Sequence, residues 1–175
     1  MKGSERLAQV AVSTPLMKKA LPQLSMPGTV MVRLLRITAF GLGSYFEPVF
    51  RSMGLTENTF HVLCLLLATD NGSASPGELS EMVGTSRANM TRLLEELIED
   101  GHVERAIDPR DGRRHIITIT DQGRAKALDT APQLREPIES AFSDLSREEF
   151  AQLDRLLRKL IVSLDKSPRQ LRFAA

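Results

Sequence analysis

The sequence has no tryptophan, one cysteine and few aromatic residues, and it lacks any long apolar run. Aromatic side chains make up 5% of the 175 residues, so Leu, Ile, Val, Met and a few Phe must build the core. Cys64 stands alone and cannot form an internal disulfide, which favours a reducing compartment. No apolar stretch approaches the ~18–20 residues of a membrane-spanning helix, and residues 1–20 do not read as a secretory signal. We therefore expect a cytoplasmic protein that crosses no membrane.

Catalytic and metal-binding motifs are also missing from the sequence. It contains no nucleophile elbow, no phosphate-binding glycine loop and no pair of catalytic carboxylates, which argues against the enzyme classes that these motifs identify. His61 and Cys64 have the spacing of half a zinc site, but no companion pair exists. We expect a protein that is not an enzyme and that holds no metal or cofactor.

The charges show no strong excess of either sign, since 23 basic and 22 acidic residues give a formal net charge of +1. Composition therefore says almost nothing about partners, and binding to nucleic acid has to be argued from where the charges sit. Apolar residues make up 42% of the chain, which is enough for an ordinary core. A chain of this length favours one compact domain with extensions.

Prolines and glycines divide the N-terminal part of the chain. Residues 1–29 predict an arm with one short helix, because several prolines interrupt the segment. Apolar positions over residues 30–49 follow helical spacing, and Pro48 is expected to end or kink that helix. A further helix, mostly buried, begins after the N-cap candidate Thr56 and stops near Gly72.

Two short helices separated by a glycine turn come next. Residues 75–78, Ser-Pro-Gly-Glu, form a capping box with proline at the first helical position. Gly84 ends this helix, Thr85 or Ser86 caps the following one, and Gly101 provides a left-handed cap at its end. This order is typical of a helix-turn-helix.

After Gly101 the pattern changes from helical to strand-like. Residues 102–107 and 115–120 predict two strands, and residues 108–113 carry the Pro and Asp-Gly of a hairpin turn. A long helix then runs from residue 121 to about Leu134, where prolines threaten its continuity. Residues 146–149, Ser-Arg-Glu-Glu, are a second capping box that opens a final amphipathic helix.

The helix that runs from Ser86 to Asp100 has an unusual distribution of charge. Its apolar residues share one face, which must point into the core. Arg87 and Arg92 lie in its first half, whereas its four acidic residues lie in the second. A surface helix ordinarily has the reverse arrangement, which suits its macrodipole. A helix whose N-terminal end enters the major groove needs cations at that end. The alternative is an ordinary amphipathic helix with a solvated face.

The predicted hairpin turn is rich in arginine. Arg110, Arg113 and Arg114 crowd a turn whose geometry is set by its Pro and Asp-Gly residues, and such a turn suits the minor groove of DNA. A carboxylate would be repelled by the phosphate backbone, so we expect Asp111 to hold an arginine in a bidentate pair. The alternative is a plain surface hairpin with local ion pairs.

The stretch ELSEMVGTSRANMTRLLEELIEDGHVERAIDPRDGRRHIITITDQGRAKA resembles the DNA-binding core of the MarR/SlyA family of bacterial regulators. The matching features are ELSEMVGTSRANMTRLLEELIEDGHVER for the helix-turn-helix, DPRDGRR for the wing, and ITDQGR for the start of the following helix. LTENTFHVL is similar to the family's second helix. The resemblance extends over about residues 30–164 and implies a mainly α-helical fold with a small β-wing, the winged helix-turn-helix.

The resemblance also implies a homodimer that binds a pseudo-palindromic operator in double-stranded DNA, with half-sites ~34–36 Å apart. Residues 30–55 and 121–166 then correspond to the interlocked dimerisation helices, residues 56–120 to the DNA-binding domain, and residues 167–175 to a tail. Carried over by position, the DNA contacts are Ser86, Arg87, Asn89, Thr91 and Arg92 on the recognition helix. Arg113 falls on the wing arginine that enters the minor groove, and Asp111 on its orienting acid.

The resemblance further implies a repressor that is released from DNA by a small aromatic or phenolic carboxylate, as in most proteins of this family. Such an effector weakens DNA binding by preferring a dimer whose recognition helices have a different spacing. The residues on suitable helices to meet such an effector are Arg33, Arg36, Tyr45 and His61.

Two other functions stay open at this point. A winged helix can serve as a protein-interaction module, which would tolerate loss of the wing arginines. A thiol-based redox regulator would act through Cys64. In the peroxide-sensing branch the reactive cysteine lies in the first helix, whereas Cys64 lies in the second among leucines, as an inert buried thiol would. The urate-responsive branch uses a tryptophan, which this chain lacks.

Overall fold

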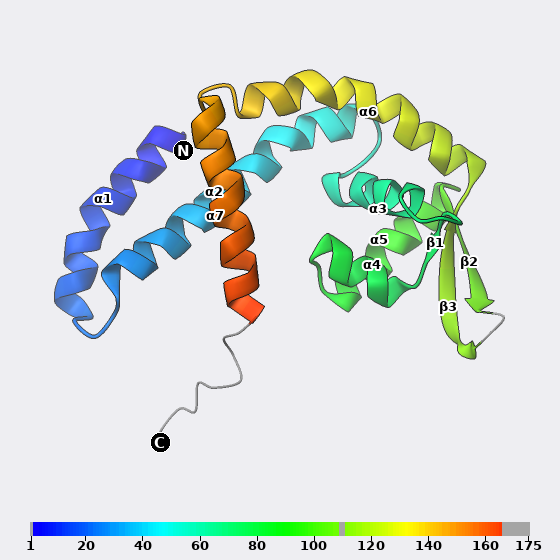
Figure 1. The fold of residues 1–175 in the computed structure, drawn as a ribbon, viewed down its shortest axis with the longest axis horizontal. Coiled ribbons are helices and arrows are strands. Elements are labelled where there is room, and N and C mark those ends of the chain that lie inside the picture. Colours follow the sequence, from blue (N-terminus) through cyan, green and yellow to red (C-terminus); the bar gives the residue numbers. More distant parts are fainter. Residues whose placement is uncertain (1, 109–110, 166–175) are drawn as a thin grey trace. The chain divides into compact units, whose positions relative to one another are not determined.

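A computed structural model of the chain describes residues 2–108 and 111–165 (Figure 1). The chain divides into two compact units, Met1–Gln133 and Leu134–Ala175, and each is described by itself. Among the described residues, no helix has both the length and the apolar character needed to cross a bilayer.

Two long helices occupy the N-terminal part of the first unit. Helix α1 spans Gly3–Ala20 and helix α2 spans Met26–Ser52. The short helix expected within residues 1–29 is therefore wrong in extent. Pro48 was expected to end or kink its helix; it does not end it, because Pro48 lies inside α2. Pro15 lies inside α1 in the same way. Proline removes one backbone hydrogen bond from a helix, and the remaining hydrogen bonds are enough for each helix to continue beyond its proline. The guanidinium carbon of Arg6 lies 4.4 Å from the centre of the Phe40 ring and joins α1 to α2.

Three shorter helices form the core of the first unit. They are α3 (Glu57–Leu67), α4 (Pro76–Val83) and α5 (Arg87–Glu99). The predicted caps are confirmed, because Thr56 and Ser75 both form capping boxes and Gly84 ends α4 with φ 74°. The fully buried side chains of these helices are Thr59, Val62, Leu63, Leu66, Leu79, Met90, Leu93, Leu94 and Leu97.

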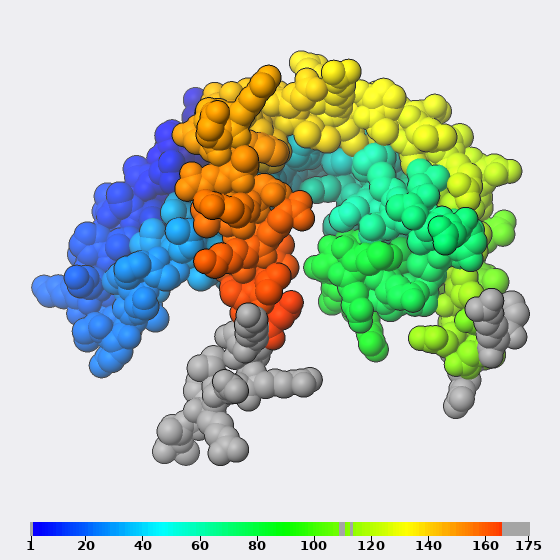
Figure 2. All heavy atoms as spheres, in the orientation of Figure 1, coloured from blue at the N-terminus to red at the C-terminus, as the bar shows by residue number. Residues whose placement is uncertain are grey.

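A three-stranded antiparallel sheet completes the first unit, with β1 (Ser73–Ala74), β2 (Val103–Asp108) and β3 (Asp111–Ile119) in the order β1-β3-β2. Strand β1 was missed in the sequence because two residues are too few for a pattern. Strand β3 begins at Asp111, which pairs with Asp108, so the expected turn over residues 108–113 is wrong in extent. We call the β2–β3 hairpin the wing; it extends past α4 and α5 (Figure 2).

The C-terminal helices are longer than their prolines suggested. Helix α6 spans Asp121–Ala141, so its expected end near Leu134 is wrong, and both Pro132 and Pro137 lie inside it. Helix α7 spans Arg147–Asp165. Its predicted capping box is confirmed, because the Glu149 carboxylate accepts from the Ser146 amide at 2.8 Å and the Ser146 hydroxyl accepts from the Glu149 amide at 3.2 Å.

The start of α6 is fastened to the end of α5 by the residues of the ITDQGR motif. The Thr120 hydroxyl lies 2.7 Å from the Gly101 carbonyl oxygen and 3.1 Å from that of His102, and it also accepts from the Gly123 amide at 3.0 Å. The Gln122 side chain donates to the Asp100 carbonyl at 3.0 Å, which satisfies an orphan carbonyl at the end of α5. A Cβ atom at Gly123 would lie 2.1 Å from the His102 carbonyl oxygen, so only glycine fits there. We call this set of contacts the α5–α6 junction.

Gly123→Ala is expected to lower the free energy of unfolding by about 2 kcal/mol or more, because backbone atoms on both sides would have to move. Thermal unfolding of the two proteins measures the loss. Gly77→Ala is the matched control, since a Cβ at Gly77 meets nothing nearer than 3.9 Å. A Gly123→Ala protein as stable as the parent would show that the close approach at the α5–α6 junction is not a real constraint.

Candidate nucleic-acid interface

Helix α5 presents one face to the core and the opposite face to solvent. The Ser86 hydroxyl caps it by accepting from the Asn89 amide at 3.2 Å. Its buried apolar residues are Met90, Leu93, Leu94 and Leu97. Arg87, Ala88, Thr91 and Arg92 are exposed. The small side chain of Ala88 leaves room for another surface to approach the backbone closely.

Among the predicted contact residues of α5, Asn89 has a second role. Its side-chain amide donates to the Thr85 hydroxyl at 2.8 Å, and its carbonyl oxygen accepts from Arg92 at 3.3 Å. Arg92 also lies 3.4 Å from the Glu96 carboxylate. An exposed pair at this helical spacing contributes little stability, so a phosphate can replace Glu96 as the partner of Arg92 at small cost.

The inverted charge distribution persists in the folded helix. The first turn of α5 holds no acidic residue and the last turn no basic one. Glu95, Glu99 and Asp100 are exposed at the far end. The exposed face of α5 therefore offers cations and free amides near its N-terminus and repels anions near its C-terminus.

The wing supplies further cations. Arg114 is exposed on β3. Arg113 also lies in β3, but its side chain and the whole of Arg110 fall outside the described residues, so the expected Asp111–Arg113 pair falls outside them too. Asp111 itself is half-buried where β3 begins.

The structure brings the start of α5 and the wing together around one open hollow of about 430 Å³. Its lining residues are Ser75, Pro76, Gly77, Arg87, Thr91, Arg114 and His115. Arg87 and Arg114 were predicted from different motifs, and the fold makes them neighbours. We call this hollow the α5–wing hollow. His115 was not among the site residues predicted from the sequence. It could have been found from its position directly after the arginines of the turn, as the first residue of the predicted strand over residues 115–120.

On its other side Arg114 shares a smaller hollow of about 180 Å³ with Glu78 and Asp108. The pKa of Glu78 is lowered, mainly because its carboxylate accepts from the Ser75 backbone amide at 2.8 Å and interacts with the Ser75 hydroxyl, and to a smaller degree because Arg114 is near. The capping box of α4 thus places an acid close to a wing arginine.

The four predicted effector residues do not meet in one place within this chain. Arg33 is half-buried and its guanidinium lies 3.7 Å from the Met17 sulfur, while Arg36 is exposed. Tyr45 lies on the same helix α2, with its ring edge-to-face against Phe46. Twelve residues of α-helix separate Arg33 from Tyr45 by about 18 Å, which is more than one small aromatic acid can span.

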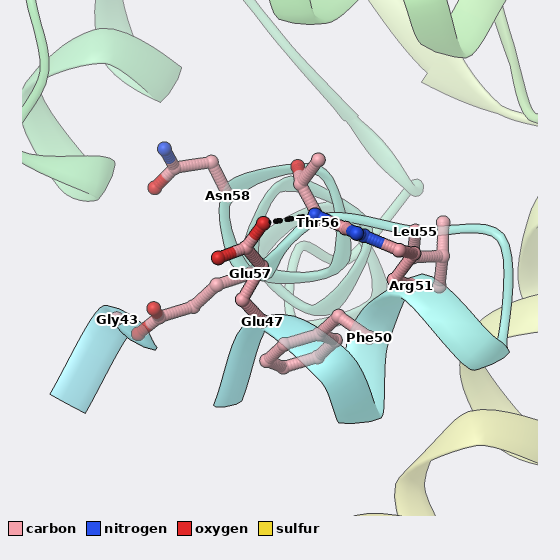
Figure 3. A pocket seen from close by; sticks show the side chains of 8 residues that line it. All are labelled: Gly43, Glu47, Phe50, Arg51, Leu55, Thr56, Glu57 and Asn58. Atoms are coloured by element: carbon pink, nitrogen blue, oxygen red, sulfur yellow. Dashed lines mark hydrogen bonds and ion pairs between the residues drawn. The ribbon is translucent and has the colours of Figure 1, made fainter. Parts of the chain in front are cut away.

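A separate hollow of about 370 Å³ lies where α2 ends and α3 begins (Figure 3). Glu47, Arg51 and Glu57 line it, and Arg51 is paired with Glu47. Two carboxylates around one engaged arginine make it a poor site for an anionic effector. None of the four predicted effector residues lines this hollow.

Cys64 is half-buried, which corrects the expectation of a buried thiol. Its surroundings still raise the pKa of the thiol, because burial disfavours the thiolate. A thiol with a raised pKa is a weak nucleophile near neutral pH, which disfavours a redox role.

Similarity to known proteins identifies the family. Residues 53–114, from just before α3 into β3, match the sequence profile of the MarR family. Over 120 residues the chain is 32% identical to the transcriptional repressor MprA of Escherichia coli K12, an alignment that covers 69% of this chain and 68% of MprA. The chain belongs to the MarR family. This MarR-family chain is therefore a DNA-binding transcriptional regulator, and the expectation that it is not an enzyme is confirmed.

Solved structures of the MarR family confirm the predicted winged helix-turn-helix fold. The chain is similar to Sco3205 of Streptomyces coelicolor, solved in complex with DNA, with a TM-score of 0.73, 22% identity and coverage of 83% of this chain and 91% of Sco3205. It is also similar to BpsR of Bordetella bronchiseptica, with a TM-score of 0.67, 28% identity and coverage of 73% and 89%. The BpsR structure concerns regulation of DNA binding by 6-hydroxynicotinic acid.

Proposed function

We propose that this MarR-family protein is a repressor that binds duplex DNA as a homodimer through α5 and the wing, and that a small aromatic carboxylate releases it. The observation that carries the DNA interface is the α5–wing hollow, where arginines of the recognition helix and the hairpin converge. Helix α5 has the exposed cations and the small Ala88 that entry into a major groove requires.

The chemistry of the side chains on α5 and the wing suggests which groove of the DNA each would contact. Arg87 and Thr91 at the start of α5 are suited to phosphates and base edges in the major groove, and Arg113 is suited to the minor groove. Asn89 positions Arg92 and Thr85 through its hydrogen bonds, so we assign it a positioning role beside any base contact. A winged-helix module that binds protein would not need cations on both elements.

Arg87→Ala and Arg113→Ala are each expected to weaken duplex binding about tenfold or more and to reduce the salt slope by about one. Fluorescence anisotropy with DNA from upstream of the protein's own gene, at several salt concentrations, measures both. Arg51→Ala is the control, since it removes the same charge from an exposed side chain on α2. Equal affinity in all four proteins would contradict the assignment of this surface, and a flat salt titration would contradict DNA binding.

The proposed homodimer is supported by apolar surface on α7. Seven large apolar side chains of this helix are between 38% and 63% exposed in the single chain, and none of its residues, all of which are described, is buried. Those seven are Phe150, Leu153, Leu156, Leu157, Ile161, Val162 and Leu164. Most recur at helical spacing on one face. Such a face marks an interaction surface, and a second copy of α7 is the occupant that the interlocked arrangement requires.

The double substitution Leu153→Glu, Leu157→Glu is expected to convert the dimer into monomer, because two charges would be buried in the interface without partners. Analytical ultracentrifugation at micromolar concentration measures the change. Arg155→Glu is the control, since residue 155 lies on the other side of the helix. A parent protein that sediments as a monomer, or a double variant that stays dimeric, would count against the proposed interface.

The proposed effector class rests on BpsR, whose DNA binding is regulated by a hydroxylated aromatic carboxylic acid. In one protomer such a molecule can reach Arg33 or Tyr45 but not both, so the two ends of α2 would serve different subsites. A repressor is released when the effector prefers a dimer whose recognition helices no longer match the DNA.

6-Hydroxynicotinate and related aromatic acids are expected to dissociate the protein–DNA complex, whereas cyclohexanecarboxylate, which has no aromatic ring, is not. The assay is repeated with Arg33→Gln, Arg36→Gln, Tyr45→Phe and His61→Gln. At least one of these variants should need about tenfold more effector for half-release while its DNA affinity is unchanged. If no aromatic acid releases the DNA, this effector class is wrong while the DNA interface stands.

A further inference from the structure

We propose that the α5–wing hollow binds one phosphate of the DNA backbone and that protonated His115 is one of its ligands, so that DNA affinity rises as pH falls. The inference rests on the proposed DNA interface and adds to it a residue and a regulatory consequence. Its starting point is that the hollow gathers groups from three elements, namely the start of α4, the start of α5 and the middle of β3.

The chemistry of the described lining residues fits an anion. Arg87 and Arg114 provide two guanidinium groups, His115 provides an imidazole, and Thr91 and Ser75 provide hydroxyl groups. None of the described lining residues is acidic. The volume of about 430 Å³ leaves room for a sugar–phosphate unit, and both arginines and His115 are exposed and can adjust to it.

The charges around His115 are mostly positive. Arg87 faces it from α5 and Arg114 precedes it on β3. On β2, Ile107 pairs with His115, and Arg105 lies two residues further along. The nearby acids, Glu78 of α4 and Asp108 of β2, line the adjacent hollow on the other side of Arg114.

Proton binding by His115 and phosphate binding in the α5–wing hollow are therefore coupled. A phosphate in the hollow favours the protonated form of His115, because the imidazolium can donate a charge-assisted hydrogen bond to it. By linkage, if DNA promotes protonation of His115, protonation must strengthen DNA binding by the same factor.

The effect can be isolated because few groups of this chain change charge between about pH 6 and about pH 8. The chain has three histidines. The His102 side chain is buried and its pKa is lowered, first by burial, so it stays neutral over most of this range. Cys64 has a raised pKa and stays a thiol. His61 is exposed on α3, away from the residues that line the hollow, and serves as the control histidine.

The experiment measures the affinity of the full-length protein for a labelled duplex of about 30 base pairs at about pH 6 and about pH 8, at constant low ionic strength. A duplex of arbitrary sequence is sufficient, because a backbone phosphate carries no base identity. The parent protein is expected to bind about three- to tenfold more tightly at the lower pH, since one unit of pKa change corresponds to a tenfold change in affinity.

The variants separate the possible outcomes. His115→Gln is expected to bind equally at both pH values, and His115→Lys to bind tightly at both, while His61→Gln keeps the ratio of the parent. A His115→Gln protein that keeps the parent's ratio would overturn the role of His115, and so would a parent with no pH dependence. A parent that binds no duplex at either pH would instead overturn the DNA-binding function itself, which separates the two failures.

Discussion

The α5–α6 junction is the contact on which the geometry of the DNA-binding surface depends. The backbone of Gly123 approaches the His102 carbonyl more closely than any side chain would allow, and Thr120 and Gln122 hold the last residues of α5 by hydrogen bonds. Because β2 begins directly after His102, the same contacts fix where the wing leaves the helix. The end of α5, the start of the wing and the first turn of α6 are therefore held together by this one set of contacts.

These contacts position the two elements of the proposed DNA interface, α5 and the wing. The α5–wing hollow exists only because Arg87 of α5 lies beside Arg114 and His115 of β3. The capping box of α4 adds a second tie, since Glu78 accepts from Ser75 and also lies near Arg114. In the proposed homodimer, a movement of the start of α6 would carry the end of α5 with it, so a small rearrangement between the two subunits would change the fit of both α5 helices to DNA.

The sequence predicted best where local chemistry decides the structure. The capping boxes at Ser75 and Ser146 and the left-handed Gly84 follow from side-chain and backbone rules that act over four residues. The lengths of the long helices were underestimated, because prolines at positions 15, 48, 132 and 137 were expected to interrupt, end or kink them. A single lost hydrogen bond does not end a helix of 18 residues or more.

The features that could not be predicted from the sequence depend on contacts between segments that lie far apart along the chain. Strand β1 exists because Ser73 and Ala74 pair with β3, more than forty positions along, and the Ser73 hydroxyl meets that of Thr118 at 2.8 Å. His115 joins Arg87 only through the register of the wing against α5. The effector residues were chosen by helix alone, and helix geometry places Arg33 and Tyr45 too far apart for one ligand.

The uncovered apolar face of α7 also affects how the stability of this protein should be measured. If association covers that face, the free energy of unfolding contains a term set by mass action, and the melting temperature rises with protein concentration. A single value obtained at one dilution would then mix the strength of the fold with the strength of the pairing. Comparisons between variants are meaningful only at matched concentrations of chain.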